Sequence, residues 1–472
     1  MAIKTKLAVI GAGPGGYAAA FLAADLGMEV TLIDMEKNPG GVCLYRGCIP
    51  SKALLHISKL LTETKEAKNW GVDFGEPKID LNKLRNWKNS VVAKLTGGLG
   101  QLTNQRKINY IQGRATFANS NLLKIEKVDG GVEEISYEHV ILATGSVPAM
   151  IPGLPANSRL VMDSTSALEI ADIPERLLVI GGGYIGLELT TVYAALGSKV
   201  TVVEMLSGLI PGADRDLVNI VARRIEKITE AVYLNSKVVE VKEHSKGLKV
   251  KLEGEKIENP ELEFDKVLVS VGRKPVSKGL GLENTKVHVN ERGFVVVNQQ
   301  LRTDDPSIYA IGDIVGNPML AHKASAEGKV AVEAIAGHKV AFEPSAIPGV
   351  VFTDPEIAYA GLTETEAKEK GIKVEVVLFP WAASGRATTL DRNDGVTKLL
   401  IDPETQRILG VGMAGVGAGE MIAEGVLAIE MSALAKDVAL SIHPHPTLSE
   451  TMMESAEIFF GQSTHLYRPK RK

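Results

Sequence analysis

The chain has little cysteine, no long apolar run and almost no net charge. Only 2 of its 472 residues are cysteine, which excludes a secreted scaffold stapled by disulfides and indicates a reducing cytoplasm. No stretch of 18 consecutive apolar residues occurs, so we expect no span across a membrane. With 57 acidic against 53 basic residues, the net charge of −4 gives no general electrostatic reason to bind nucleic acid or an anionic membrane.

What is present fits a globular protein of several domains. An apolar content of 45% and a charged content of 23% are ordinary for a folded protein, and the length suggests about three domains. The first apolar run, Leu7 to Ile10, has the length of a strand and enters a glycine-rich turn, so we expect no signal peptide. The basic tail Arg468 to Lys472 is interpreted as a solvated terminus, and Trp70 and Trp87 as packing anchors of a helical stretch.

The two cysteines, Cys43 and Cys48, lie five positions apart. One turn brings both sulfurs within disulfide reach. Pro50, expected at the first helical position, places Cys48 at a helix N-terminus, where the helix dipole favours a thiolate. A buried structural pair or half of a metal site is the alternative, but only His56 lies near enough in sequence to add a ligand. A dithiol redox centre is therefore favoured, and no metal is expected.

Two segments share the order strand, glycine turn, helix, strand, acidic residue. In each, 23 positions separate the first glycine from the acid, Gly11 to Asp34 and Gly181 to Glu204. This is the dinucleotide-binding fingerprint in its required context. The first glycine makes the turn, the second admits the pyrophosphate, the third lets the helix pack, and the helix N-terminus holds the phosphate charge. The glycines are Gly11, Gly13, Gly16 in the first copy and Gly181, Gly183, Gly186 in the second.

Two fingerprints imply two dinucleotides, and the second acid indicates which one its copy prefers. Glu204 repels the 2′-phosphate of NADP, and no Arg or Lys follows it before Arg215. NAD is therefore favoured at the second copy. The symmetry alone does not say which copy holds a flavin.

The cysteine segment and both fingerprints resemble the pyridine nucleotide–disulfide oxidoreductases, a flavoprotein family. Within it, the run from Gly40 to Leu55 is most similar to the dihydrolipoamide dehydrogenases. Two departures stand out: Tyr45-Arg46 replaces the usual Asn-Val, and Val276 replaces a common Asn. The resemblance covers essentially the whole chain, and its other segments are Ala143–Ser146, Ser270–Pro275, Thr303–Asp313, Ala321-His322 and His443–Glu450.

The resemblance implies an α/β fold with two Rossmann-like dinucleotide-binding domains and a C-terminal α+β dimerisation domain. The N-terminal copy is then expected to bind FAD and the second copy NAD. A homodimer follows, with the His-Pro-Thr segment reaching into the partner's redox site. The expected boundaries are residues 1–149 for the FAD-binding domain, 150–272 for the NAD-binding domain, 273–347 for the central continuation of the FAD-binding domain and 348–472 for the dimerisation domain.

The resemblance also assigns roles to four groups of the redox centre. Cys43 is expected as the interchange thiol that forms a mixed disulfide with the substrate, and Cys48 as the charge-transfer thiolate under the flavin. His445 is the candidate general base, since imidazole titrates near neutral pH. Glu450 is expected to fix its tautomer. His443, two positions away, is the alternative base, and the His445-Pro446 bond is a candidate cis peptide.

Lys52 and Glu188 are expected to pair beside the flavin, where the cation stabilises the thiolate and reduced flavin. Two separate exposed charges are the alternative. The residues expected to bind FAD are Gly11, Gly13, Gly16, Asp34, Lys52, Gly113, Thr144, Gly145, Ser146, Asp313 and Ala321, and those expected to bind NAD are Gly181, Gly183, Gly186, Glu204 and Gly272.

The resemblance implies oxidation of protein-bound dihydrolipoamide, with electrons passed to NAD+. The implied partners are lipoyl domains of 2-oxo acid dehydrogenase or glycine cleavage complexes. Glutathione reductases prefer NADPH and usually carry Lys where Ser51 stands, and mercuric or large thioredoxin reductases need a further thiol, yet no cysteine follows Cys48. A flavin transhydrogenase has no need of the cysteine pair, and a non-catalytic binding subunit is expected to have lost it.

Overall fold

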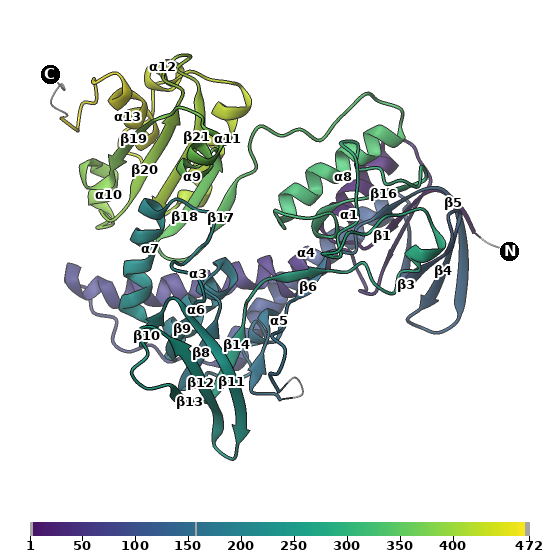
Figure 1. The fold of residues 1–472 in the computed structure, drawn as a ribbon, viewed down its shortest axis with the longest axis horizontal. Coiled ribbons are helices and arrows are strands. Elements are labelled where there is room, and N and C mark those ends of the chain that lie inside the picture. Colours follow the sequence, from purple (N-terminus) through teal and green to yellow (C-terminus); the bar gives the residue numbers. More distant parts are fainter. Residues whose placement is uncertain (1–2, 156–157, 468–472) are drawn as a thin grey trace.

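Three folded bodies make up the molecule (Figure 1). The computed structural model describes residues 3–155 and 158–467, so the predicted solvated tail lies outside the described residues. The first body holds the N-terminus, the second lies in the middle of the sequence, and the third contains the yellow-green C-terminal elements. This mixed α/β architecture confirms the fold class expected from the sequence. None of the helices in the described ranges is long and apolar enough to cross a membrane.

The first body is built on a sheet whose parallel part has the order β3-β2-β1-β5-β16, with β4 pairing antiparallel to β3 and β5. Residues Leu7 to Val9 of β1 are fully buried, as expected for the central strand of a parallel sheet covered on both faces. Helices α1 and α8 pack together on one face. The elements are β1 (Ile3–Ile10), α1 (Pro14–Asp25), β2 (Val30–Asp34), β3 (Asn109–Asn119), β4 (Leu122–Lys127), β5 (Val132–Leu142), β16 (Ile308–Ala310), η3 (Gly312–Ile314) and α8 (Ala321–Ile335).

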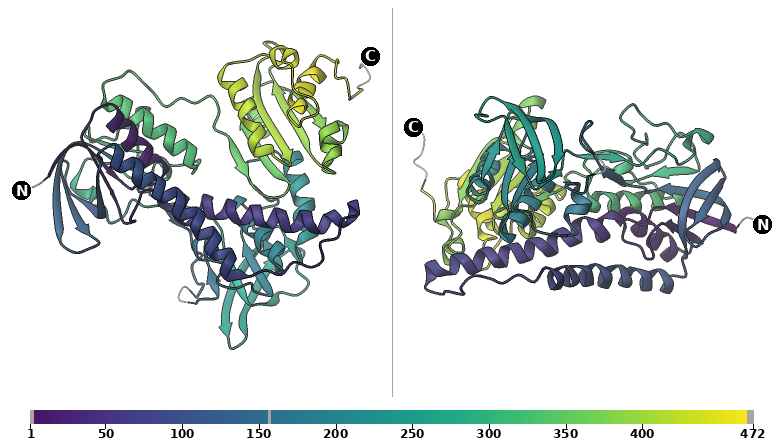
Figure 2. Two further views of the ribbon diagram at one scale, coloured as in Figure 1. Left: turned by 180° about the vertical axis from the view of Figure 1, so that it is seen from behind. Right: turned by 90° about the horizontal axis from the view of Figure 1, so that it is seen from below.

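A long helical excursion leaves the first body after β2. Its helix α3 runs against the second and third bodies, and α4 returns alongside it (Figure 2). Cys48 is the first residue of α3 and Pro50 the third, so the prediction of Pro50 at the first helical position is wrong by two positions. Trp70 and Trp87 are 53% and 39% exposed, so the expectation of packing anchors is also wrong. The elements are α2 (Gly41–Arg46), α3 (Cys48–Glu66), η1 (Ala67–Trp70) and α4 (Leu81–Gln105).

The second body repeats the nucleotide-binding pattern with a parallel sheet of order β10-β9-β8-β14-β7. An antiparallel three-stranded sheet, β11-β12-β13, projects from it. Its elements are β7 (Val161–Met162), α5 (Ser164–Ala167), β8 (Arg176–Ile180), α6 (Tyr184–Leu196), β9 (Lys199–Val203), α7 (Arg215–Ile228), β10 (Ala231–Tyr233), β11 (Ser236–His244), β12 (Gly247–Gly254), β13 (Glu261–Phe264) and β14 (Lys266–Val269).

Two short antiparallel strands, β6 (Ser146–Pro148) and β15 (Arg273–Pro275), mark where the chain leaves the first body and returns to it. After β15 the chain passes η2 (Leu282–Asn284) and then adds β16 to the first sheet. The first body is therefore discontinuous in sequence, and the second body is inserted between its strands β5 and β16.

The third body is an antiparallel sheet of order β17-β18-β21-β20-β19 with helices packed against it. Trp381, Phe379 and Met413 are fully buried in its core. Its elements are β17 (Gly349–Val351), β18 (Glu356–Gly361), α9 (Glu364–Lys370), β19 (Glu375–Pro380), η4 (Trp381–Ala383), α10 (Gly385–Thr389), β20 (Val396–Ile401), β21 (Ile408–Gly415), α11 (Ala418–Glu430), α12 (Ala435–Leu440) and α13 (Glu450–Phe459).

Candidate active site

The cysteine pair lies where α2 meets α3. Cys43 is half-buried in α2, whereas Cys48 is exposed at the first position of α3, and both are thiols in this structure. Gly47 between them has no room for a side chain, since a Cβ there would lie 2.9 Å from the carbonyl oxygen of Val42. The prediction of a cysteine at a helix N-terminus is confirmed for Cys48.

The two thiols differ in acidity. A hydrogen bond from Cys43, helped by the charge of Lys52, lowers the pKa of Cys48 to about 7, against burial and the charge of Glu188, which act in the opposite direction. The same hydrogen bond and burial raise the pKa of Cys43. Cys48 is therefore the first of the two thiols to lose its proton, and Cys43 keeps its own.

The predicted Lys52–Glu188 pair forms, and it joins all three bodies. Lys52 Nζ lies 3.0 and 2.9 Å from the two carboxylate oxygens of Glu188, which is almost fully buried in α6. Ser51 Oγ donates to Glu188 at 2.9 Å, and the backbone N–H of Phe352, in the third body, donates at 3.1 Å. Ser51 was not predicted as a ligand of this carboxylate. The alternative of two separate exposed charges is excluded.

Both glycine turns fit a bound pyrophosphate. A Cβ at Gly11 would lie 2.3 Å from the carbonyl oxygen of Ala143, so the first glycine is required by the fold itself. At Gly13 the nearest atom would be 4.0 Å away and at Gly183 nothing lies within 4 Å, so no neighbouring protein atom forbids a side chain at these middle positions. Both are also N-caps without a side-chain hydrogen bond, which leaves helix N–H groups available to an anion.

The third glycines, by contrast, are packing positions. A Cβ at Gly16 would lie 1.8 Å from the carbonyl oxygen of Gly11, and at Gly186 2.2 Å from that of Gly181. At Gly181 itself a Cβ would lie 2.5 Å from the carbonyl oxygen of Ser270. The two turns therefore share one design, in which only the middle glycine faces open space.

The acids of the two fingerprints are held in the same way. Asp34 Oδ2 accepts a 2.6 Å hydrogen bond from the N–H of Ala12, and Glu204 Oε2 accepts one of 2.6 Å from Gly182. Each acid thus lies directly beside its glycine turn, at the carboxyl end of a parallel strand. Burial raises the pKa of Asp34, and the hydrogen bond from Ala12 opposes this.

Four of the residues expected around FAD meet where β6 and β15 pair. Ser146 Oγ donates to Asp313 Oδ2, and Thr144 Oγ1 donates to the carbonyl oxygen of Val276 at 2.7 Å. Gly145 adopts a left-handed backbone with φ of 69°. Arg273, which was not among the predicted site residues, donates to both Ser146 oxygens at 2.7 Å and lies 3.9 Å from Asp313. The Ser270–Pro275 motif was the available signal for it.

The remaining predicted glycines and Ala321 lie at element ends or in tight contacts. Gly113 lies in β3 one position past Gln112, the register partner of Asp34, and a Cβ there would lie 2.7 Å from the carbonyl oxygen of Glu126. Gly272, with φ of 114° and open space around it, precedes β15. Ala321 is the first residue of α8. Their roles in cofactor binding stay predictions.

Two tyrosines that were not predicted flank the redox pair. Burial, with the nearby charges of Cys43 and Cys48, raises the pKa of Tyr17 in α1. Burial also raises the pKa of Tyr184, which feels the charges of Arg273, Asp313 and Cys48. Each tyrosine directly follows a glycine of its fingerprint, and this position in the sequence could have identified both as residues near the site.

His445 and Glu450 form a pair on the third body. The ring Nδ1 of His445 lies 2.8 Å from Glu450 Oε1, and Glu450 Oε2 accepts from the N–H of Thr447 at 2.7 Å. Burial opposes ionisation of Glu450, but these hydrogen bonds outweigh it and hold the pKa of the carboxyl below its usual value. The His445 side chain is 71% exposed, and the His445–Pro446 peptide is cis, as predicted.

The alternative base is engaged elsewhere. His443 is buried, with its Nε2 lying 2.8 Å from Glu424 and its Nδ1 lying 2.9 Å from the carbonyl oxygen of Ser441. Both of its ring nitrogens are thus occupied, whereas the His445 side chain is mostly exposed and its contact with Glu450 uses Nδ1. Among residues 3–155 and 158–467, no hydrogen bond joins His445 to either cysteine.

The residues that depart from the family pattern make their side-chain contacts with other segments than the cysteines. Tyr45 Oη donates to the carbonyl oxygen of Asn38 at 3.0 Å, and Arg46 forms an ion pair with Glu36. Both partners lie in the loop that follows Asp34. Val276 contacts Gly145 and Thr144 through its backbone, so these contacts do not depend on its side chain.

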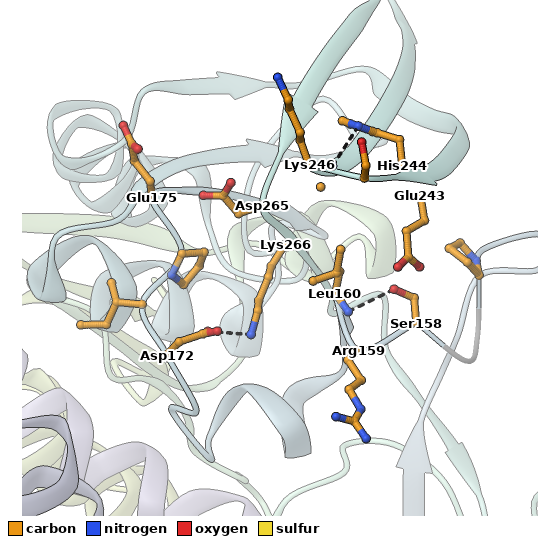
Figure 3. Close-up of a pocket in the computed structure, with 15 residues that line it drawn as sticks. Ser158, Arg159, Leu160, Asp172, Glu175, Glu243, His244, Lys246, Asp265 and Lys266 are labelled. Atoms are coloured by element: carbon orange, nitrogen blue, oxygen red, sulfur yellow. Dashed lines mark hydrogen bonds and ion pairs between the residues drawn. The ribbon is translucent and has the colours of Figure 1, made fainter.

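A broad open hollow of about 1120 Å³ lies at the opposite edge of the second body (Figure 3). Leu160, Glu175 and Lys266 line it, at the amino ends of β7, β8 and β14. Nucleotides bind α/β sheets at the carboxyl ends of the strands. The hollow is therefore not part of the candidate site.

Known proteins resemble the chain over its whole length. Residues 5–328 match the family model for pyridine nucleotide-disulphide oxidoreductase, and residues 347–456 match the dimerisation domain of that family. A dihydrolipoyl dehydrogenase of Haemophilus influenzae is 47% identical over 470 residues, covering 100% of this chain and 98% of the relative. One from Geobacillus stearothermophilus is 44% identical, covering 98% of each. The HOCl-induced flavoprotein disulfide reductase RclA from Escherichia coli superposes with a TM-score of 0.85 at 29% identity, covering 96% of this chain and 99% of that chain.

Proposed function

Because the chain belongs to the pyridine nucleotide-disulphide oxidoreductase family, we propose that Cys43 and Cys48 accept an electron pair from a protein-bound dihydrolipoyl group. The electrons then pass through FAD to NAD+, the cofactors of this family. The observation that carries the proposal is the exposed Cys48 at the start of α3, next to the Lys52–Glu188 pair. Relatives of matching length are named dihydrolipoyl dehydrogenase, which supports this substrate.

The proposed reaction begins with the cysteines joined as a disulfide. His445 of the partner subunit removes a proton from one substrate thiol, whose sulfur attacks Cys43. The Cys43–Cys48 bond breaks, and Cys48 leaves as a thiolate, which the positive charge of Lys52 favours. The second substrate thiol then loses its proton to solvent and attacks the substrate sulfur of the mixed disulfide, so that the oxidised lipoyl group is released and Cys43 leaves with the proton held by the partner's His445.

FAD, when bound, would supply the two-electron carrier between the thiolate and NAD+. The chain's own residues hold each group in place. The helix N-terminus at Gly13 would hold the pyrophosphate of FAD and Asp34 its ribose, and Gly183 and Glu204 would do the same for NAD. Lys52, fixed by Glu188, places a positive charge near the Cys48 thiolate, where it would also stabilise a reduced flavin.

The preference for NAD over NADP rests on charge. Glu204 already accepts two backbone hydrogen bonds beside the glycine turn, and it repels a 2′-phosphate. Arg215, the first basic residue after it, donates to the backbone carbonyl oxygens of Leu209, Ile210 and Ala213. The guanidinium is therefore not directed at the ribose.

The dimerisation domain supports a homodimer. We propose lipoyl domains of 2-oxo acid dehydrogenase or glycine cleavage complexes as partners and the cytoplasm as the location, which fits the scarcity of cysteine. The division at residues 149, 272 and 347 is part of the proposal, and the β6–β15 pair at two of these boundaries supports it.

Turnover assays with paired substrates test this function. The protein is expected to be yellow and to make NADH from NAD+ and dihydrolipoamide, but not to reduce glutathione disulfide with NADPH. A Cys43→Ser variant is expected to bind FAD and to lose dihydrolipoamide turnover. A protein that reduces only glutathione disulfide, or a Cys43→Ser variant with full activity, would show that the proposal is wrong.

A further inference from the structure

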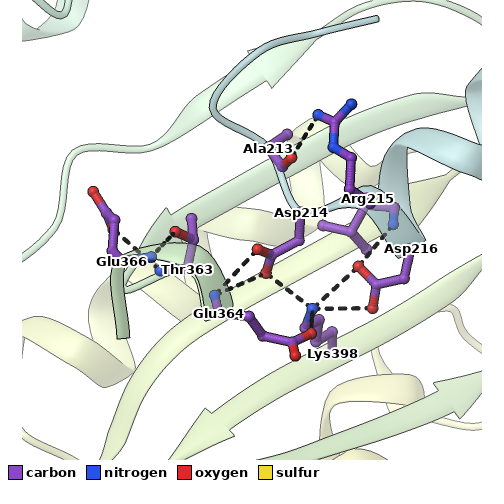
Figure 4. A network of polar contacts seen from close by, with 9 residues as sticks. Ala213, Asp214, Arg215, Asp216, Thr363, Glu364, Glu366 and Lys398 are labelled. Atoms are coloured by element: carbon purple, nitrogen blue, oxygen red, sulfur yellow. Dashed lines mark hydrogen bonds and ion pairs between the residues drawn. The ribbon is translucent and has the colours of Figure 1, made fainter. Parts of the chain in front are cut away.

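A fully buried lysine joins the third body to the second (Figure 4). Lys398 lies in β20 with no exposed side-chain surface, and its ammonium group reaches the start of α7. Its Nζ lies 2.9 Å from Asp214 Oδ2 and 3.0 Å from Asp216 Oδ2, and it also contacts Glu364. Burying a lysine is costly unless acids surround it, so this contact is a specific attachment between the two bodies, beside the apolar residues that they share.

The three acids around Lys398 favour the protonated form of its amino group. Burial alone would lower the pKa of Lys398, but hydrogen bonds to Glu364, Asp214 and Asp216 outweigh it and raise the pKa. Asp214 is 7% exposed, whereas the other two acids keep part of their surface in solvent. Of the three acids, Asp214 is therefore the one whose negative charge depends most on neutralisation by Lys398.

Asp214 does not make the hydrogen bond that is usual for an aspartate at a helix N-cap. It is the N-cap of α7, where an aspartate normally accepts a hydrogen bond from its own helix, but it makes no such bond. Its carboxylate instead accepts from Lys398 and from the N–H of Glu364 at 3.1 Å, both in the third body. The start of α7 is thus fixed from outside the second body.

Asp214 also ends the loop 205–214, which begins directly after the ribose-facing Glu204. Arg215, the next residue, ties this loop together by donating to the carbonyl oxygens of Leu209 at 2.8 Å and Ile210 at 2.7 Å. The N–H of Ile210 in turn donates to Gly182, inside the second glycine turn, at 2.9 Å. A continuous set of contacts therefore runs from Lys398 to the NAD fingerprint.

The loop is also strained. Ile210 has φ of 48°, a conformation that a β-branched residue adopts only when its surroundings impose it. A loop under strain returns to a relaxed form when its anchors are removed. The anchor at its far end is Asp214, held by Lys398.

We propose that Lys398 is a positioning residue for the pyridine nucleotide, which holds Asp214 and so keeps the loop 205–214 against the second glycine turn. Through this contact the dimerisation domain increases the affinity of the second body for NAD, although the domain itself does not contact NAD. The inference rests on the proposed function only in taking NAD as the ligand of the second body. An ion pair that merely stabilises the fold is the competing explanation.

Three variants of the FAD-loaded dimer separate these explanations. Lys398→Met and Asp214→Asn are expected to raise the Kd for NAD+ at least tenfold, measured by calorimetry, and to raise KM for NAD+ more than they change kcat. Glu364→Gln removes another carboxylate from the same ammonium but leaves Asp214 and the loop in place, so its Kd is expected to stay within twofold of the wild type. If Lys398→Met does not fold, Asp214→Asn carries the test.

The half-reaction that involves no NAD provides the second readout. Flavin reduction by dihydrolipoamide alone, followed by stopped-flow absorbance, is expected to be unchanged in all three variants. An unchanged Kd in both Lys398→Met and Asp214→Asn, or an equal loss in the NAD-free half-reaction, overturns the positioning role. A wild-type protein that binds NAD+ but is not reduced by dihydrolipoamide overturns the proposed function instead, and the comparison of Kd values still decides the role of Lys398.

Discussion

Among single residues, Lys52 is expected to tune the acidity of the redox thiol Cys48. Its ammonium lowers the pKa of Cys48 and neutralises the buried Glu188, whose charge raises it. In a Lys52→Met variant both effects favour the protonated thiol, so we expect the pKa of Cys48 to rise by about one unit, equivalent to about 1.4 kcal/mol. Because thiolate reactivity is lost as pH falls through this pKa, the pH profile of activity should move to higher pH.

The ultraviolet absorbance of the thiolate in the reduced protein measures this pKa directly. In the wild type the absorbance is expected to be half-developed near pH 7. Lys65→Met, in the last turn of the same helix, is the matched control and should titrate as the wild type does. Identical curves for Lys52→Met and the wild type would contradict the electrostatic account.

The middle glycine of the second turn gives a different kind of test. Gly183 has an ordinary backbone conformation, and a Cβ added there would meet no atom within 4 Å, so Ala fits the fold. Its methyl group would occupy the space of the NAD pyrophosphate. Gly183→Ala is therefore expected to raise KM for NAD+ at least tenfold while thermal unfolding changes little.

Gly186→Ala provides the contrast, because its Cβ would lie 2.2 Å from the carbonyl oxygen of Gly181. This variant should unfold at clearly lower temperature or fail to accumulate. If Gly183→Ala is as unstable as Gly186→Ala, the open space at the turn is not a ligand position.

At the level of elements, helix α2 is held by the two residues that depart from the family pattern. Tyr45 and Arg46 bind Asn38 and Glu36, in the loop after Asp34, the acid of the first fingerprint. The double variant Tyr45→Asn, Arg46→Val removes both ties and restores the residues usual in lipoamide enzymes. We expect faster FAD release on dilution, by several-fold, with unchanged turnover in excess FAD.

Fluorescence of released flavin measures this rate. Arg106→Val, which removes an ion pair with Asp25 at the other end of α1, is the matched control and should release FAD as the wild type does. Equal release rates for the double variant and the wild type would show that these ties do not hold the cofactor.

An element could be predicted from the sequence where neighbouring residues alone determine where it begins. The starts of α1 and α6 follow from a glycine turn after an apolar strand, and both helices begin there. The predicted start of α3 is two residues late. The prediction relied on the preference of proline for the first helical position, whereas the helix already begins at Cys48.

Contacts between distant segments explain the residues that were missed. Arg273 meets Ser146, and Lys398 meets Asp214, across more than a hundred residues of sequence. No local pattern marks such a contact. The pairing of Lys52 with Glu188 was predicted only through the family resemblance. The exposure of Trp70 was not predicted, because composition does not tell which face of a helical segment is covered.

For the whole molecule, the exposed His445–Glu450 pair predicts shared active sites. A heterodimer of one Cys43→Ser chain and one His445→Gln chain contains one site with both wild-type groups, if each histidine serves the partner. Each homodimer of either variant contains none. Random assembly gives half heterodimers, so about a quarter of the wild-type activity is expected on co-expression.

Purification through two different tags isolates the heterodimer, which should show about half of the wild-type activity per dimer. Mixing the separately folded homodimers without subunit exchange is the control and should restore none. An inactive heterodimer that binds FAD normally would place the base within its own chain.

The insertion of the second body between β5 and β16 has a consequence for synthesis on the ribosome. β16 pairs with β5, yet it emerges only after the whole second body has been made. The second body is continuous in sequence from β7 to β14, so it can fold while the first sheet still lacks its edge strand. The usual order, in which the N-terminal domain finishes first, is therefore reversed, and residues Val140 to Leu142 at the end of β5 wait for their partner until β16 arrives.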